Sequence, residues 1–432
     1  FQIGHATTDY RVALGDVPVE HSTLGARSDL KGLFFESNAG RLQLSGAAGQ
    51  QAETWRSLAL RRLRHTPLRD VYAVKVGSTT AEGLSIFGTG QGYAEDADSI
   101  DAVWQLSPQQ RASATTVGLD YMSPSWQVQA EAGVSRWQVD GTAAVNDRAR
   151  RLAVTWQGET VSVQGGHHDV GAAYAALSAD VVPGARETYL NSGWRATDRV
   201  QLAAGVRRAK NSLLEGTENL NQGNLPHRVD QLDASAMVDM SAVATGLQLQ
   251  ANVHEGAGEN FDNSDLRTRT QGVNLSYPVG QFTTSLGLQH NRFENGATPL
   301  QDATAKLLST GLGWSNAMVE DAVWRWNVFG QYNLQHQRFD AGGIGLNRSV
   351  SLSMDLQRER WGSLRAAAQW GRLRHSTTGS VIGRSLQFDA TTTPSKLGAI
   401  KAYARVGQNS STVANASYKE RVYGLQWLLG MD

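Results

Sequence analysis

The sequence predicts an all-β protein, a single closed antiparallel β-barrel that crosses a membrane. Apolar and polar residues alternate with a period of two along segments of about ten residues, the length that a tilted strand needs to cross a bilayer. Short turns and long polar connections follow one another in succession, as they do in membrane barrels. The 432 residues include 45 glycines, 9 prolines and no cysteine. Their mean hydropathy of -0.37 suits a thin apolar surface better than a pooled core.

Alternation is strictest between residues 126 and 135, where Trp126, Val128 and Ala130 are separated by Gln127 and Gln129. The same pattern recurs along residues 243–254, 282–289, 324–335, 349–357 and 400–406. Strands of soluble sandwiches are usually about five or six residues long. The length of these segments therefore favours a wall that spans a membrane.

The connections predict the strand count. Short turns lie near residues 37–39, 122–124, 157–159, 196–198, 240–242, 278–280 and 357–360. Long polar stretches cover residues 49–68, 93–111, 166–184, 208–228, 255–266, 292–303, 337–347, 374–383 and 407–419. A first strand near residues 10–17, ten hairpins and a last strand near residues 420–429 give about 22 strands, within a range of roughly 18 to 24. We expect one domain over residues 1–432, with residues 1–9 as a periplasmic lead-in and no plug domain.

These features resemble the outer-membrane β-barrels of Gram-negative bacteria, and the resemblance covers essentially the whole chain. It implies a multi-pass barrel in the cell outer membrane, with short periplasmic turns and long extracellular loops. The expected partners are outer-membrane lipids and lipopolysaccharide. Locally, Leu14-Gly15-Asp16 followed by Lys31-Gly32 resembles the start of pilus-usher barrels. The sequence ends on Gly430-Met431-Asp432, whereas the last strand of the class usually ends on an aromatic residue.

Tryptophans near the predicted strand ends are candidates for the aromatic girdles that lie at membrane interfaces. The alternative is that tryptophan occurs wherever a sheet is half buried. The girdle candidates are Trp126, Trp137, Trp156, Trp194, Trp314, Trp324, Trp361, Trp370 and Trp427.

Charged residues on the polar phase of the alternation are expected to face the lumen. These lumen candidates are Lys75, Glu131, Arg151, Arg207, Asp233, Arg325, Asp355, Arg365, Lys401 and Arg405. Both signs occur with a positive excess, which predicts a weak anion preference. Alternatively, oppositely charged pairs simply brace the wall.

Two of the long connections have roughly helical spacing. Residues 54–65 carry Arg56, Arg61, Arg62 and Arg64, either as a constriction inside the mouth or as a surface loop. Residues 170–179 are expected to form a small helix.

The sequence contains no motif of a known enzyme class, so we expect no enzyme activity, cofactor or metal. His167 and His168 are adjacent, so in a strand they would point to opposite faces, and they are interpreted as polar residues at a loop entry. The acidic segment 255–265 lacks the glycine spacing and terminal Glu of an EF-hand, and is interpreted as a solvated loop. A net charge of zero gives no reason to expect nucleic-acid binding.

The predicted width of the barrel suggests its function. Barrels of about 22 strands enclose a lumen that known transporters keep plugged. Here the filling would have to come from inward-folded loops, a periplasmic or lumen-filling partner protein, or another domain. The first hypothesis is therefore an export or secretion channel for a macromolecule. The alternatives are a diffusion porin for small solutes and a scaffold or receptor barrel with a permanently filled lumen. The oligomeric state is left open.

Overall fold

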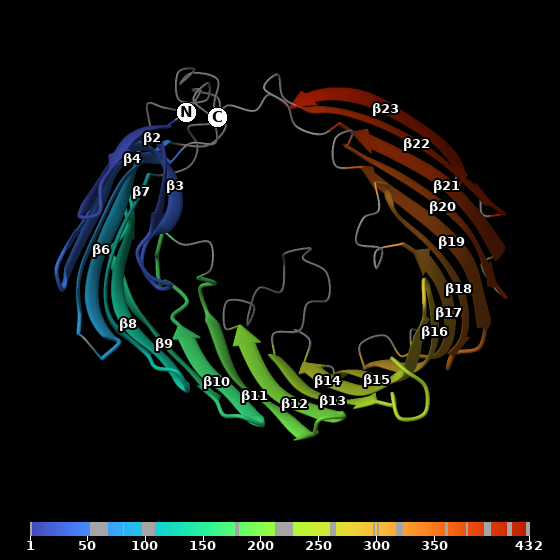
Figure 1. The fold of residues 1–432 in the computed structure, drawn as a ribbon. Helices are drawn as coiled ribbons and strands as arrows, with labels where there is room; N and C mark the ends of the chain where they lie inside the picture. Colours follow the sequence, from blue (N-terminus) through green and yellow to red (C-terminus); the bar gives the residue numbers. More distant parts are fainter. Residues whose placement is uncertain are drawn as a thin grey trace. The chain divides into compact units, whose positions relative to one another are not determined.

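The structure, a computed structural model, describes residues 2–51, 68–80, 82–96, 109–177, 181–211, 228–259, 265–296, 299, 302–316, 323–358, 362–376, 379–392, 399–412 and 417–428. In these residues the fold is all-β and contains no α-helix, with 23 strands in one sheet (Figure 1). From β1 to β10 and from β14 to β23, strands pair in chain order and antiparallel. The predicted antiparallel all-β fold is confirmed, and the count lies within the expected range.

The chain divides into two compact units. Unit 1 contains Phe1–Gly193 with Gly205–Asp230, and unit 2 contains Trp194–Ala204 with Gln231–Asp432. The first ten strands are β1 (Gln2–Ala6), β2 (Tyr10–Glu20), β3 (Arg27–Ala39), β4 (Leu42–Gln51), β5 (Leu68–Thr79), β6 (Leu84–Asp96), β7 (Gln110–Met122), β8 (Trp126–Val139), β9 (Val145–Gln157) and β10 (Val161–Val170). Strands β11 (Ala185–Thr197), β12 (Val200–Asn211) and β13 (Arg228–Asp239) contain residues of both units.

The remaining strands belong to unit 2. They are β14 (Gln248–Glu259), β15 (Asp265–Val279), β16 (Phe282–Asn295), β17 (Ala303–Ser315), β18 (Arg325–Phe339), β19 (Ile344–Arg358), β20 (Gly362–His375), β21 (Gly379–Thr391), β22 (Ala399–Ser411) and β23 (Tyr418–Leu428). Most strands are longer than the ten residues expected.

Each unit has an apolar and a polar face, because successive side chains in a strand point to opposite sides. On the apolar face large side chains are exposed, including Val117 and Val134 in unit 1 (both 63%) and Leu288 and Leu312 in unit 2 (both 56%). Their register partners are uncharged and are Ala132, Thr115, Leu308 and Thr284. The polar face carries the charged residues that the sequence assigns to a lumen, such as Glu131 opposite Arg151 and Asp355 opposite Arg365.

The connections define two ends of the strands. We call the end with the tight connections 40–41, 123–125, 158–160 and 280–281 the turn end, and the opposite end the loop end. The expected difference in length between the connections at the two ends of the strands is smaller in unit 2. At the loop end, residues 340–343 form a tight turn, and the strands continue well into the predicted loops 255–266, 337–347 and 374–383. These predictions were wrong because most strand residues in these segments are polar or glycine, a composition that resembles a loop in sequence.

The start of the chain also differs from expectation. Residues 1–9 were predicted as a lead-in, but Gln2–Ala6 forms β1 and pairs with β2 as far as Gly15. From Asp16 onward, the described residues of β2 pair with β3 alone. Gly15 has a φ of 120°, a conformation that side-chain-bearing residues rarely adopt. This glycine marks the place where the β2–β3 hairpin leaves the plane of the sheet.

The end of this hairpin, residues 16–31, is here called the tip ribbon (β2 and β3 in Figure 1). Its base is held by an ion pair between Lys31 and Asp16, which lie opposite each other in register. Val17, Val19 and Leu30 are at most 2% exposed, and they pack in a cluster with Val71 and Ala73 of β5. Burying each of these side chains contributes roughly 1.5–3 kcal/mol. The ribbon is therefore docked on the polar face of unit 1.

Candidate functional site: the polar face and the docked tip ribbon

The turn of the tip ribbon reaches strands β8 and β9. The Ser22 hydroxyl donates to Glu131 Oε1 at 2.6 Å, and the Leu24 amide donates to Glu131 Oε2 at 3.1 Å. Beside them, Arg151 Nη1 donates to Thr23 Oγ1 at 2.5 Å. Glu131 is only 8% exposed, so its charge is compensated by these donors and by Arg151, its register partner.

The turn of the tip ribbon approaches β6 closely at Gly25. A Cβ added to Gly25 would lie 2.9 Å from Thr89 Oγ1 of β6 and 2.3 Å from Ser22 Oγ. Thr89 in turn shares a 2.8 Å hydrogen bond with Thr116 of β7, and both side chains are buried. Glycine is thus the residue that permits this contact.

The connection after β10 contacts the ribbon and also strands β6 and β8 of the wall. The Tyr174 hydroxyl donates to the Leu24 carbonyl at 3.1 Å, and the Arg27 amide donates to the Leu177 carbonyl at 2.8 Å. The Leu177 amide donates to Gln91 Oε1 at 3.2 Å. Burial, with the nearby Glu131 carboxylate, raises the pKa of Tyr174, which is 1% exposed and stays a neutral donor. A helix was predicted over residues 170–179, but the described part is irregular, with turns at 172 and 173 that direct Tyr174 to the ribbon.

His21 is a buried polar side chain of the ribbon whose ring nitrogens lack hydrogen-bond partners among the described residues. It is 3% exposed. Burial and the positive charge of Lys75 lower the pKa of His21 to about 4. The imidazole is therefore neutral at pH 7, and docking depends on its staying neutral.

A polar cavity of about 240 Å³ lies beneath the turn. It is lined by His21, Lys75, Asp120, Glu131 and Arg151, among others. Lys75 Nζ lies 4.7 Å from the centre of the Phe87 ring, which borders the same cavity. The structure thus brings together the lumen candidates Lys75, Glu131 and Arg151.

A second cavity, of about 560 Å³, lies on the other side of Thr23. Arg27, Arg151, Arg207 and Lys210 line it, with Glu187 as the acidic residue of the set. Arg207 Nη2 donates to Glu187 Oε2 at 2.7 Å. The surplus of basic groups makes this cavity suited to an anion.

The polar face of unit 2 holds the remaining lumen candidates. Arg325, Asp355, Arg365 and Lys401 line one cavity of about 740 Å³. Arg365 Nε donates to Asp355 Oδ1 at 2.6 Å, so this pair also braces neighbouring strands, as the alternative interpretation expected.

Two lumen candidates lie outside this cavity. Arg405 pairs in register with Gln387, one of its lining residues. Asp233 contacts His254 Nδ1 at 2.6 Å. Arg56, Arg61, Arg62 and Arg64 lie outside the described residues, so the constriction expected from them is not described.

Most girdle candidates lie at one end of the strands. Trp126, Trp156, Trp194, Trp314, Trp324 and Trp427 are at or near the turn end of their strands. Trp126 pairs in register with Trp156, and Trp314 stacks on Phe282 with ring centres 6.0 Å apart.

Three candidates differ. Trp137 shares the face of buried Glu131 and Ser135, so it cannot contact lipid through the apolar face. Trp370 lies in mid-strand opposite Val350, and Trp361 lies outside the described residues.

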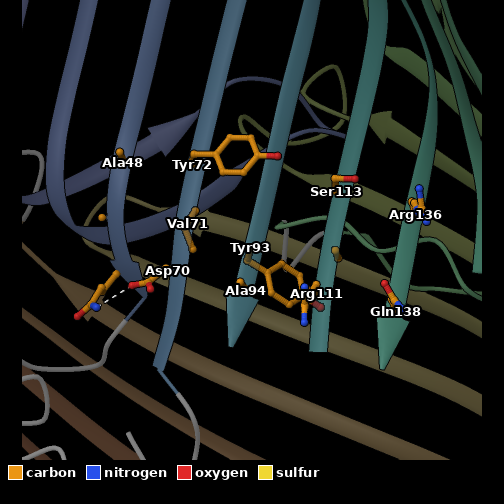
Figure 2. Close-up of a pocket in the computed structure, with 13 residues that line it drawn as sticks. Ala48, Asp70, Val71, Tyr72, Tyr93, Ala94, Arg111, Ser113, Arg136 and Gln138 are labelled. Atoms are coloured by element: carbon orange, nitrogen blue, oxygen red, sulfur yellow. Dashed lines mark hydrogen bonds between the residues drawn. The ribbon is translucent and has the colours of Figure 1, made fainter. Parts of the chain in front are cut away.

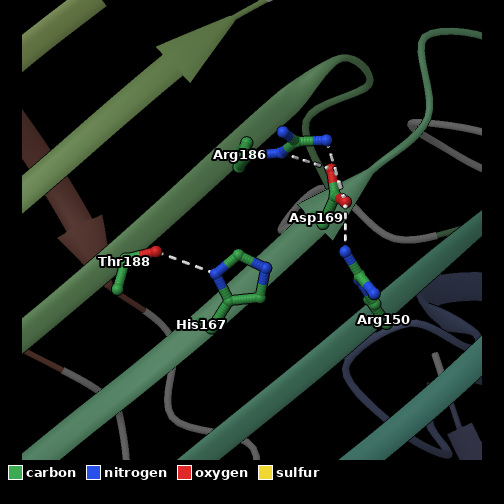
Figure 3. A network of polar contacts seen from close by, with 5 residues as sticks. All are labelled: Arg150, His167, Asp169, Arg186 and Thr188. Carbon is green, nitrogen blue, oxygen red and sulfur yellow. Dashed lines mark hydrogen bonds and ion pairs between the residues drawn. The ribbon is translucent and has the colours of Figure 1, made fainter.

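The histidine pair and the described start of the acidic segment 255–265 lie in strands. His167 and His168 lie within β10, not at a loop entry, and His167 Nδ1 contacts Thr188 Oγ1 at 2.8 Å (Figure 3). His254–Glu259 completes β14, while residues 260–264 are not described. Among the described residues, no three His, Asp or Glu side chains group as metal ligands. No described helix is long and apolar enough to cross a membrane.

Sequence reasoning missed the tip ribbon and a set of arginines on the apolar face. His21, Ser22 and Thr23 stand in a short connection with no distinctive motif, and no local signal indicates their contacts with residues more than 100 positions away. The arginines were detectable, because Arg348 and Arg372 stand in phase with the apolar residues Val350 and Trp370.

No family model and no curated protein matches the chain. Among solved structures, it is similar to the outer membrane transporter YddB from Escherichia coli, with 10% identity over 92% of this chain and 75% of that one and a TM-score of 0.45. It is also similar to the outer membrane protein opdK from Pseudomonas aeruginosa, with 12% identity over 74% and 93% and a TM-score of 0.40.

A third similar structure is OmpT, an outer membrane protein of Vibrio cholerae, with 13% identity over 79% of this chain and 97% of that one and a TM-score of 0.36. All three are outer-membrane proteins.

Proposed function

We propose that the chain is an outer-membrane β-barrel that forms a channel, narrowed from within by its own tip ribbon. The observation that carries this proposal is the division of the sheet into an exposed apolar face and a polar face. Soluble monomers rarely expose contiguous apolar patches above a few hundred Å². A bilayer would cover such a face, and closing the sheet would remove its free edges.

The polar face would then line the lumen. Basic side chains outnumber acidic ones in two of its cavities, the one beside Arg151 and Arg207 in unit 1 and the one beside Arg365 and Lys401 in unit 2. The cavity beneath the turn, beside Lys75, has three of each sign. Rings of basic side chains favour anions in pores. Passage of small, preferably anionic solutes is the function that this arrangement supports best.

Export of a macromolecule is the second candidate. A barrel of 23 strands would enclose a lumen wide enough to need a filling. In this case a periplasmic or lumen-filling partner protein would displace the tip ribbon from the polar face.

A cysteine tether tests the channel and the role of the ribbon together. The chain has no native cysteine, so Ser22→Cys and Glu131→Cys provide the two thiols of the variant, one on each side of the 2.6 Å contact. Oxidation in the presence of a short dithiol linker joins them through two reducible disulfides, because a cysteine is shorter than the glutamate it replaces. In planar bilayers we expect the parent protein to conduct in steady steps. The oxidised double variant should show fewer openings, and reductant should raise its conductance above that of the parent, because both native hydrogen bonds of Glu131 are gone.

Ser22→Cys alone is the matched control and should not respond to oxidant. Steps that are identical in oxidised and reduced protein would contradict the narrowing by the ribbon. Silence of every form would contradict the channel and favour a scaffold barrel. Very large, unstable openings after reduction would favour macromolecular export.

A further inference from the structure

The loop end of the apolar face carries exposed arginines. In unit 1 they are Arg111, Arg136, Arg148, Arg150, Arg186 and Arg208, and in unit 2 they are Arg269, Arg292, Arg338, Arg348, Arg372, Arg374 and Arg384. We call this set the arginine rim. The turn end of the same face carries the tryptophans instead. The two borders of the apolar face therefore differ in chemistry.

In unit 2, arginines of the rim lie directly opposite each other. Arg348 of β19 is the register partner of Arg372 of β20, and Arg269 of β15 is the partner of Arg292 of β16. Side chains so placed have Cβ atoms about 4.5–5.5 Å apart, and like charges at this distance destabilise a sheet. Glu294 already accepts from Arg292 Nε at 2.6 Å, so the anion-dependent pair is Arg348 with Arg372. An anion held between these two guanidinium groups would remove their repulsion.

The surroundings of Arg348 and Arg372 are basic and apolar. Arg384 of β21 lies opposite Trp370, and Arg374 lies opposite Leu346. Toward the turn end, Val350 and Leu352 are 43% and 51% exposed, and Leu386 is 55% exposed. A ligand for this cluster needs a charged head and an apolar body.

In unit 1 the rim borders two grooves. The first, of about 610 Å³, has Ala48, Tyr72 and Ala94 along it, with Arg111 and Arg136 at its border (Figure 2). The second, of about 590 Å³, is lined by Val117, Ala132 and Val134 together with Arg148, Arg150 and Arg186.

Asp169 holds two of these arginines in place. Its carboxylate accepts from Arg186 at 3.0 and 3.1 Å and from Arg150 at 3.1 Å (Figure 3). The side chains of Arg150 and Arg186 are nevertheless 68% and 61% exposed, so donors of both face outward.

Arginine suits phosphate, because its planar group donates two parallel hydrogen bonds to an oxyanion. We propose that the arginine rim binds the phosphate groups of an anionic lipid whose acyl chains lie along the apolar face. The occupant is a phosphorylated glycolipid of the leaflet around the loop end. This inference rests on the proposed membrane location and does not require that the barrel conducts.

A site-directed fluorescent probe tests the cluster in unit 2. With no native cysteine, Leu386→Cys in the otherwise unchanged full chain can carry an environment-sensitive dye beside Arg384. In neutral detergent, bis-phosphorylated lipid A should change the dye emission with saturation. Arg348→Gln with Arg372→Gln should raise the half-saturating concentration at least tenfold.

Arg365→Gln, on the polar face of the same β20, is the matched control and should leave that concentration unchanged. Dephosphorylated lipid A that binds as tightly would overturn the proposal, as would inorganic phosphate that saturates the site without lipid. Circular dichroism and heat-dependent migration check that the variants fold. Steady conductance of the double variant in a neutral bilayer would show that the channel survives even where lipid binding is lost.

Discussion

The Ser22 hydroxyl lies 2.6 Å from Glu131 Oε1 although 109 residues of chain separate the two positions. Through this contact the end of the β2–β3 hairpin is held against β8. We expect Glu131→Ala to free the turn, because it removes the carboxylate that accepts from both Ser22 and Leu24. Single-channel recordings should show a higher mean conductance and more noise. Gln129→Ala, at a residue lining the same cavity, is the control. Equal recordings from the two variants would refute the role of Glu131.

Low pH should weaken the docking of the tip ribbon, because it protonates His21. Its folded pKa of about 4 lies below the 6.5 of a free histidine. Docking is therefore fully stable above pH 6.5 and loses stability as pH falls toward 4, by up to about 3 kcal/mol. We expect conductance to rise between pH 7 and pH 5. His21→Phe should flatten this pH profile. His336→Phe replaces a histidine that is exposed on β18, and it should leave the profile unchanged. A His21→Phe profile as steep as that of the parent would exclude His21 as the titrating group.

Docking of the tip ribbon should be sensitive to a side chain added at Gly25. A Cβ at this position would lie within 3 Å of two side-chain oxygens, so Gly25→Ala should weaken docking by about 1–3 kcal/mol. Gly46→Ala is the control, since the nearest atom to a Cβ there is 3.8 Å away. Limited proteolysis at residues 21–26 measures docking, and faster cleavage is expected only for Gly25→Ala. Similar cleavage of both variants would argue against tight seating of this turn.

The charge of the polar face should set ion preference. Arg365→Gln leaves Asp355 without the guanidinium that now lies 2.6 Å away, so the lumen becomes more acidic. The reversal potential in a salt gradient should shift toward cation preference. Arg348→Gln removes the same charge from the apolar face and should leave the reversal potential in place. A shift of equal size in both variants would mean that the two faces are not separated by the wall.

The architecture was predictable because alternation is local. Val128 and Gln129 reveal their faces from the sequence alone, and the same phase assigns Glu131 and Arg151 to the polar face. The ends of the strands were less predictable, because residues such as Arg338 and Asn347 are polar whether they form a strand or a loop.

The docked ribbon could not be predicted. Its position depends on contacts between Ser22 and Glu131 and between Leu24 and Tyr174, and these pairs have no shared sequence pattern. The adjacent arginines Arg348 and Arg372 follow from register, but only a structure fixes that register.

The ribbon also constrains the order of folding. Its turn belongs to the second and third strands of the chain, yet its partners lie on β8, β9 and the connection after β10, up to 150 residues later. Contacts so distant in sequence close slowly, because a long loop must be ordered before they form. The strands through β10 must therefore assemble beside an undocked hairpin, and docking follows only after the connection beyond β10 has formed.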